Sequence, residues 1–261
     1  MSPSFLAPST PSFAAGVSPP YTAIVEFRRR LLRTLEAMQP VLEEAGVLVV
    51  GSEVPNLIEP NAAATLVVSQ DVDLAIPVQR LAAVKARLPE VQGLHPSVEE
   101  PSVWIPDASD LIEVNFIGMD STLKDPLEAH VLEDDELPLL VFGALSLVRP
   151  GTPVRVEGLT IPVPRLAGLL VEKLLTDRGG EKGDRDLLVA LALLVLAREE
   201  DLAEIDETYV ALVPELRHTI CSNLAILSLM ESRPGMPDPG PHRARIAALL
   251  RRLEGVKEAP G

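Results

Sequence analysis

We expect an α+β fold in which a mixed β-sheet is flanked by helices and followed by a C-terminal helical bundle. Between residues 47 and 163, short apolar stretches are bounded by turn residues, which is typical of strands. After Pro164, apolar residues recur at helical spacing. The two patterns meet between Pro150 and Pro164, so we expect an α/β domain at 21–163 and a helical domain at 164–261.

The N-terminal part of the chain predicts an arm and one long helix. Residues 1–20 are rich in Pro, Ser and Ala with little charge, which favours a disordered or loosely packed arm. A helix is expected from Tyr21 to Gly46, and it ends there because glycine suits a helix end. Its predicted apolar stripe consists of Val25, Leu31, Leu32, Leu35, Met38 and Leu42.

A short strand is expected at Val47–Val50, ending at Gly51-Ser52. Ser52 could cap a short helix that begins near Glu53. The strand pattern returns between Leu66 and Ile76, and a helix is expected at Val78–Leu88.

Two hairpins are predicted next. Val103–Ile105 and Leu111–Ile117 flank a turn sequence with Pro, Ser and two Asp residues. Val154–Val156 and Thr160–Val163 flank Glu157-Gly158.

The second half reads as helices throughout. Leu187–Ala197 is apolar on nearly all sides, so this helix must be buried centrally or at an interface, and a homo-oligomeric partner is one expectation. The expected helices are Leu166–Thr176, Asp184–Glu199, Leu202–Val213, Pro214–Glu231 and Pro241–Val256.

Composition limits the class of protein. The 261 residues carry a net charge of −15, which argues against broad electrostatic binding to nucleic acid. The single cysteine, Cys221, excludes an internal disulfide and fits a reducing compartment. The longest apolar run is too short to span a bilayer, and the N-terminus lacks a signal-peptide pattern. We therefore expect a soluble, cytoplasmic protein with no membrane partner.

Three carboxylates carry the predicted chemistry. Asp71 and Asp73 alternate with Val72 on a strand, so both side chains point to the same face. Two adjacent carboxylates repel each other unless a cation lies between them, and hard oxygen ligands are what Mg²⁺ prefers. Glu113 interrupts an apolar strand, where a charge is costly unless it is paired. We expect all three to be catalytic residues and metal ligands.

Gly51-Ser52 is expected to bind phosphate. Glycine allows the backbone to approach a phosphate closely, and Ser52 adds a hydroxyl at a helix N-terminus that favours anions. Two Mg²⁺ ions about 3.5–4 Å apart could then align an attacking hydroxyl with an α-phosphate and stabilise the leaving pyrophosphate.

The order Gly51-Ser52, Asp71-Val72-Asp73 and Glu113 resembles the nucleotidyltransferase (polymerase-beta-like) superfamily, whose signature is a GS turn, a DxD strand and a third acidic strand. Within it the chain is most similar to the AbiEii-type nucleotidyltransferases, which include toxins of toxin–antitoxin pairs. The likeness extends to the segments Leu170–Leu175, Asp177-Arg178 and Lys182–Leu187.

The resemblance implies a nucleotidyltransferase-like sheet and further nucleotide-binding residues. Lys173 matches the lysine that contacts the triphosphate in that group, and Asp184 and Arg185 match the turn that supports the site. The implied reaction transfers a nucleoside monophosphate from a nucleoside triphosphate (NTP) to a hydroxyl acceptor on RNA or protein.

Several positions depart from the family pattern. The third carboxylate is Glu113 where Asp is usual, and the gap from Ser52 to Asp71 is long. The arginine often found a few residues before the DxD is missing. These departures support the alternative of a non-catalytic nucleotide-binding or protein-interaction module, for example one half of a toxin–antitoxin pair. A phosphatase with Asp71 as nucleophile is disfavoured, because Leu74–Ile76 continues the strand where that group has a turn.

Overall fold

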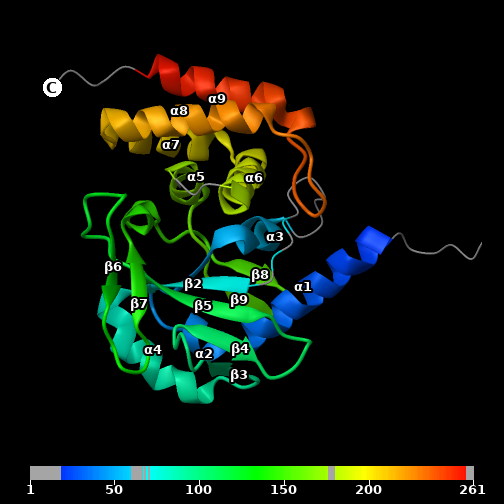
Figure 1. Cartoon of the computed structure of the whole chain (residues 1–261), viewed down its shortest axis with the longest axis vertical. Coiled ribbons are helices and arrows are strands. Elements are labelled where there is room, and N and C mark those ends of the chain that lie inside the picture. Colours follow the sequence, from blue (N-terminus) through cyan, green and yellow to red (C-terminus); the bar gives the residue numbers. More distant parts are fainter. Residues whose placement is uncertain (1–18, 60–66, 68, 70, 176–179, 257–261) are drawn as a thin grey trace, which may run out of the picture.

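The computed structural model describes residues 19–59, 67, 69, 71–175 and 180–256. A mixed sheet with helices packed against it forms one half of the molecule, and layered helices are stacked on that half (Figure 1). The predicted α+β fold is therefore confirmed. Residues 1–18 of the expected arm lie outside the described residues, and the boundary expected between 163 and 164 stays a prediction.

The sheet is built around two long parallel strands. β2 (Asp71–Pro77) pairs along its whole length with β5 (Glu113–Met119). In the first half of each strand buried and half-buried residues alternate, so one face packs into the core and the other carries polar groups. On the far side of β2, β1 (Leu48–Val50) pairs with it antiparallel, and Val50 lies opposite Asp73.

The other side of β5 has two different neighbours. Its first half pairs antiparallel with β4 (Val103–Pro106), which pairs in turn with β3 (Leu94–Pro96). Its second half pairs in parallel with β7 (Leu139–Phe142), which also pairs with β6 (Ala129–Leu132). The predicted pairing of the two strands on either side of residues 106–110 is confirmed. Strands β3, β6 and β7 were not predicted, since each is short and lacks a clean apolar alternation.

The N-terminal helix is interrupted, contrary to the single helix expected from Tyr21 to Gly46. α1 (Pro19–Ala37) ends before α2 (Gln39–Leu42), which has Pro40 in its first turn. Val25 was expected on the buried stripe but is 52% exposed, whereas Leu31, Leu32, Leu35, Met38 and Leu42 are buried as predicted.

Two shorter predictions hold with small changes of boundary. The helix expected at Val78–Leu88 is α4 (Leu81–Arg87) with a 3₁₀ turn at either end. The hairpin of β8 (Val154–Val156) and β9 (Leu159–Ile161) is confirmed. Its turn residues Glu157 and Gly158 have φ of 49° and 89°, which suits the left-handed geometry of a two-residue hairpin turn.

The C-terminal half consists of helices, as predicted. α6 packs on α5, α8 and α9, and residues Leu187–Leu194 of α6 are buried within this chain. The apolar helix therefore has its cover inside the molecule and needs no partner for it. The bounds are α5 (Leu166–Leu175), α6 (Gly180–Leu196), α7 (Glu199–Ala211), α8 (Pro214–Leu229) and α9 (Arg243–Gly255).

None of the helices formed by the described residues is both long and apolar enough to cross a membrane.

Candidate active site

The predicted carboxylates come together at the start of the two central strands. Asp71 lies opposite Glu113 and Asp73 opposite Asn115 in the parallel pairing of β2 with β5. Neighbouring strands are about 4.8 Å apart, so these four side chains share one patch on the same face of the sheet. Val72 and Val114 between them are fully buried on the opposite face.

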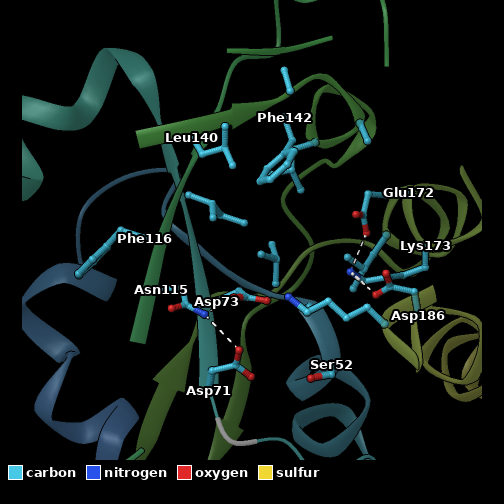
Figure 2. Close-up of a pocket in the computed structure, with 18 of the residues that line it drawn as sticks. Ser52, Asp71, Asp73, Asn115, Phe116, Leu140, Phe142, Glu172, Lys173 and Asp186 are labelled. Atoms are coloured by element: carbon cyan, nitrogen blue, oxygen red, sulfur yellow. Dashed lines mark hydrogen bonds and ion pairs between the residues drawn. The ribbon is translucent and has the colours of Figure 1, made fainter. Parts of the chain in front are cut away.

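Asn115 bridges the two aspartates. Its side-chain amide donates to Asp71 Oδ2 at 3.2 Å and to Asp73 Oδ1 at 3.1 Å (Figure 2). Asn115 and Glu113 lie on the same face of β5. The side chain of Asn115 nevertheless bonds to the two aspartates of β2. The amide holds both carboxylates in a fixed orientation toward the cavity.

Position 51 requires glycine because its backbone lies very close to the Asp73 carboxylate. It has φ of 83°, and a Cβ on it would lie 2.6 Å from Asp73 Oδ2. The two residues are brought together by the pairing of β1 with β2, in which Val50 lies directly opposite Asp73. The glycine turn and the second aspartate therefore form one unit.

Ser52 does not cap the short helix, contrary to expectation. The N-cap position of helix α3 (Val54–Ile58) is Glu53, whose side chain makes no capping hydrogen bond. Residues Gly51–Glu53 form a 3₁₀ turn before this helix. The Ser52 hydroxyl instead donates to the Glu53 carboxylate, at 3.0 and 2.9 Å from its two oxygens. Ser52 still lines the cavity.

Glu53 is a buried acid that sequence reasoning missed. Its side chain is 0% exposed, and burial, with the nearby charge of Asp73, raises its pKa to about 8. The Ser52 hydroxyl and Arg185 counteract this rise in part. No local pattern marks Glu53 as buried, because its cover comes from elements distant in sequence.

The patch has an excess of negative charge. Burial raises the pKa of Asp73, the neighbouring Asp71 raises it further, and Lys173 opposes the shift. Burial also raises the pKa of Glu113, with smaller contributions from Asp71 and Glu100. A bound cation would relieve this repulsion.

Lys173 reaches the site from α5, within the helical half. It is 8% exposed, and its ammonium lies 3.3 Å from Glu172 Oε2 and 3.4 Å from Asp186 Oδ1 (Figure 2). It also interacts electrostatically with Asp73. The predicted lysine thus lies beside the predicted carboxylates, already engaged by two acidic neighbours that were not predicted as site residues.

Arg185 joins the helical half to the Gly51-Ser52 turn and to Ser69. It donates to Ser52 Oγ at 3.4 Å and also to the hydroxyl of Ser69, which itself donates to Asp71 Oδ1 at 2.5 Å. No arginine directly precedes Asp71 in sequence, and this one reaches the same neighbourhood from α6. Asp184 is not brought in: it pairs with Arg233 and is absent from the described cavity wall.

The predicted carboxylates, Asn115, the Gly51-Ser52 turn, Lys173 and Arg185 line one cavity of about 720 Å³ between the sheet and the helices. Its basic lining residues are Lys173, Lys182 and Arg185. Leu140 and Phe142 of β7 add an apolar part of the wall (Figure 2), and Glu100 and Glu128 are further acidic residues that line the cavity. Lys182 was not among the predicted nucleotide-binding residues.

The carboxylates fit a magnesium site in part. In the portion of the chain that the structure describes, no three or more His, Cys, Asp or Glu side chains are grouped so that they could hold a metal ion. Asp71 and Asp73 remain as a pair of hard oxygen donors whose mutual repulsion contributes to the raised pKa of Asp73. Mg²⁺ is commonly held by one or two carboxylates together with substrate phosphates, so this pair suits it.

Comparison with known proteins identifies no family. No protein-family model matches the sequence, and no curated protein matches it. Among solved structures, the chain is similar to the antibiotic-resistance factor ANT(2'')-Ia, in a solution structure reported to reveal substrate-regulated conformation dynamics. The match covers 76% of this chain and 99% of that chain, at 11% identity and a TM-score of 0.38. A likeness this low carries no functional conclusion, which must come from the geometry of the site.

Proposed function

We propose that this chain is a Mg²⁺-dependent nucleotidyltransferase that transfers a nucleoside monophosphate from an NTP to a hydroxyl acceptor. The observation that carries the proposal is one cavity in which a carboxylate pair, Asp71 and Asp73, faces a Gly51-Ser52 turn and the cations of the helical half. Anionic groups next to cationic groups suit a triphosphate that is bound together with a metal ion.

In the proposed reaction the acceptor oxygen attacks the α-phosphorus of the triphosphate. A new P–O bond forms to the acceptor, the bond between the α-phosphorus and the bridging oxygen breaks, and pyrophosphate leaves. Asp73 or Glu113 takes the proton of the acceptor hydroxyl, since the raised pKa of each carboxyl makes it a stronger base. Gly51, Ser52, Lys173 and Arg185 hold the phosphates.

Bound Mg²⁺, in one or two ions, would neutralise charge on the phosphates and polarise them for attack. Asp71 and Asp73 are the proposed ligands, with Glu113 as the third. Asn115 would keep the pair correctly oriented through its two hydrogen bonds.

Charge on the cavity wall bears on the choice between the two proposed acceptors. Glu100, Glu113 and Glu128 line the cavity in addition to Asp71 and Asp73. Carboxylates repel the phosphodiesters of RNA, so a hydroxyl on a protein suits this wall better than one on RNA. A role as the toxin of a toxin–antitoxin pair, with an antitoxin-like partner, belongs to the same proposal and rests on the AbiEii-like motifs alone.

Pyrophosphate release tests the proposed reaction. The protein is incubated with Mg²⁺ and each labelled NTP, and pyrophosphate is measured over time. The double variant Asp71→Ala/Asp73→Ala is expected to lose release by at least about 10³-fold, because it removes the proposed metal ligands. Asp135→Ala, in an exposed loop, is the matched carboxylate control and should release at the wild-type rate. Equal release from the double variant and the control would refute the assignment.

The second candidate is a non-catalytic nucleotide-binding or protein-interaction module on the same fold. The favouring observation is that, within the described chain, the carboxylates are not grouped as a ready metal site. Calorimetry with Mg²⁺ and each NTP separates the candidates. Binding without turnover supports a nucleotide-binding module, and no binding of any NTP supports an interaction protein.

A further inference from the structure

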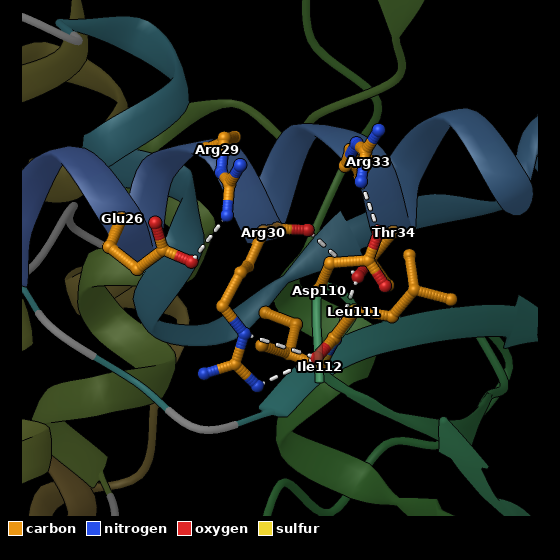
Figure 3. Close-up of polar contacts among 8 residues, drawn as sticks. All are labelled: Glu26, Arg29, Arg30, Arg33, Thr34, Asp110, Leu111 and Ile112. Carbon is orange, nitrogen blue, oxygen red and sulfur yellow. Dashed lines mark hydrogen bonds and ion pairs between the residues drawn. The ribbon is translucent and has the colours of Figure 1, made fainter. Parts of the chain in front are cut away.

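Helix α1 contacts the backbone directly before Glu113. It lies across the start of β5, and its polar side chains point at residues 110–112 (Figure 3). The contacts come from one face of the helix, formed by Arg30, Arg33 and Thr34. None of these residues lines the cavity.

Thr34 makes the most enclosed of these contacts. Its side chain is 0% exposed, and its hydroxyl accepts a hydrogen bond of 2.9 Å from the backbone N–H of Ile112. The same hydroxyl donates to the backbone carbonyl of Arg30 at 2.9 Å. Because the hydroxyl both donates and accepts, its orientation is fixed, and it joins the Leu111–Ile112 peptide to the helix backbone.

Arg30 holds the carbonyl end of the same peptide group. Its Nε and Nη2 both donate to the carbonyl oxygen of Leu111, at 3.2 and 2.7 Å. Arg33 pairs with the side chain of Asp110, one residue earlier. Helix α1 thus holds both polar atoms of the Leu111–Ile112 peptide, and it holds the side chain of the preceding Asp110.

The sheet itself leaves this segment incompletely held. β2 pairs with β5 from Glu113 onward, while the register with β4 includes only Val114 and Asn115. In the described part of the chain, the residues directly before Val114 are therefore not paired with β4. The hydrogen bonds from α1 supply the missing restraint directly before the residue whose carboxylate faces Asp71.

We propose that Thr34 and Arg30 are positioning residues for Glu113, which hold its carboxylate beside Asp71 through the backbone of Leu111 and Ile112. The inference rests on the proposed function, since it assigns the two residues a role in that same site. Distant restraint of this kind matters because small displacements of a metal ligand or base cost much of its effect.

Threonine variants separate positioning from packing. Thr34→Val keeps the shape of the side chain and removes the hydroxyl, whereas Thr34→Ser keeps the hydroxyl. Thr208→Val in α7 is the control, because Thr208 makes a similar bond to its own helix, to the carbonyl of Glu204, away from the site. Thr34→Val is expected to lower kcat and raise the Mg²⁺ concentration for half-maximal rate, each by about 10-fold. Thr34→Ser and Thr208→Val should stay near wild type.

Rates are expressed per folded molecule, with folding followed by circular dichroism, and Mg²⁺ binding is measured by calorimetry as a readout independent of turnover. A folded Thr34→Val protein with the wild-type kcat, Mg²⁺ requirement and Mg²⁺ affinity would overturn the inference. If Thr34→Val does not fold, Arg30→Met with Arg30→Lys as its conservative partner provides the same comparison. Absence of pyrophosphate release from the wild type would instead contradict the proposed function.

Discussion

Gly51 illustrates how a single backbone position shapes the site. A side chain there would meet the Asp73 carboxylate at 2.6 Å, and the backbone has a φ that favours glycine. Burial and the neighbouring Asp71 meanwhile raise the pKa of Asp73. Gly51 therefore allows the backbone to lie against the Asp73 carboxylate, whose pKa is raised in this position.

Glu53 predicts a pH dependence of stability. Its pKa is about 8 in the folded protein, against 4.5 ordinarily, so between these values the folded state keeps a proton that the unfolded state has lost. Stability from this group is therefore full below about pH 4.5 and is lost as pH rises toward 8, by up to about 1.4 kcal/mol per pH unit.

The variant Glu53→Gln tests this dependence, since glutamine is uncharged at every pH and keeps an acceptor for Ser52. Denaturant unfolding from pH 5 to pH 8.5, with a chelator present, should show the variant gaining stability relative to wild type as pH rises. Glu90→Gln, at an exposed position, is the control and should track the wild type. Parallel curves for Glu53→Gln and wild type would show that Glu53 does not titrate as proposed.

The position of a site residue could be predicted from the sequence only where a local pattern determines it. Alternation on a strand is local, so Asp71 and Asp73 could be placed on one face from their spacing. The strand pairing that sets Glu113 opposite Asp71 is long-range and has no such local pattern. The bond from Arg185 to Ser52 joins residues 133 positions apart, and no sequence periodicity encodes such a distance. The burial of Glu53 depends on the same long-range packing.

At the scale of elements, α5 and α6 act as the second wall of the cavity. Lys173 from α5 lies buried between Glu172 of the same helix and Asp186 of α6. The lysine compensates two buried carboxylates and at the same time opposes the charge of Asp73. The junction of these helices therefore contributes both to stability and to the electrostatics of the site.

Removing this cation should cost stability and nucleotide affinity together. Lys173→Met keeps most of the side-chain length but leaves the carboxylates without their counter-ion, a change that typically costs about 3–5 kcal/mol at a buried pair. Lys124→Met, on an exposed lysine, is the matched control. Chemical unfolding measures the first effect and calorimetry with Mg²⁺ and NTP the second. If Lys173→Met is as stable as the control and binds NTP equally well, Lys173 has neither role.

Elements were predicted best where the pattern is long. The helices after Pro164 and the strands β2 and β5 follow clear apolar periods, so their type could be inferred. β6 and β7 were missed because each has only four residues and is defined by its pairing in the sheet rather than by a clear apolar alternation of its own. The break between α1 and α2 arises at Pro40, which the expectation of a continuous helix passed over.

At the scale of the molecule, the cavity exists because the two halves of the chain meet. The sheet contributes Asp71, Asp73 and Gly51, and the helices contribute Lys173 and Arg185. The carboxylate pair thus comes from the sheet, and Lys173 comes from a helix that covers it (Figures 1 and 2). Neither half alone has both the carboxylate pair and the basic residues, so the proposed chemistry belongs to the assembled fold.

Position-specific labelling of the triphosphate tests the central claim most directly. Parallel reactions contain the wild-type protein, Mg²⁺ and NTP labelled at either the α- or the γ-phosphate, and products are separated by charge and size. Nucleotidyl transfer is expected to carry the α-label into an acceptor-bound nucleoside monophosphate, while the γ-label appears only in pyrophosphate. Recovery of the γ-label in orthophosphate or on the acceptor, with the α-label left in a nucleoside diphosphate, would contradict nucleotidyl transfer.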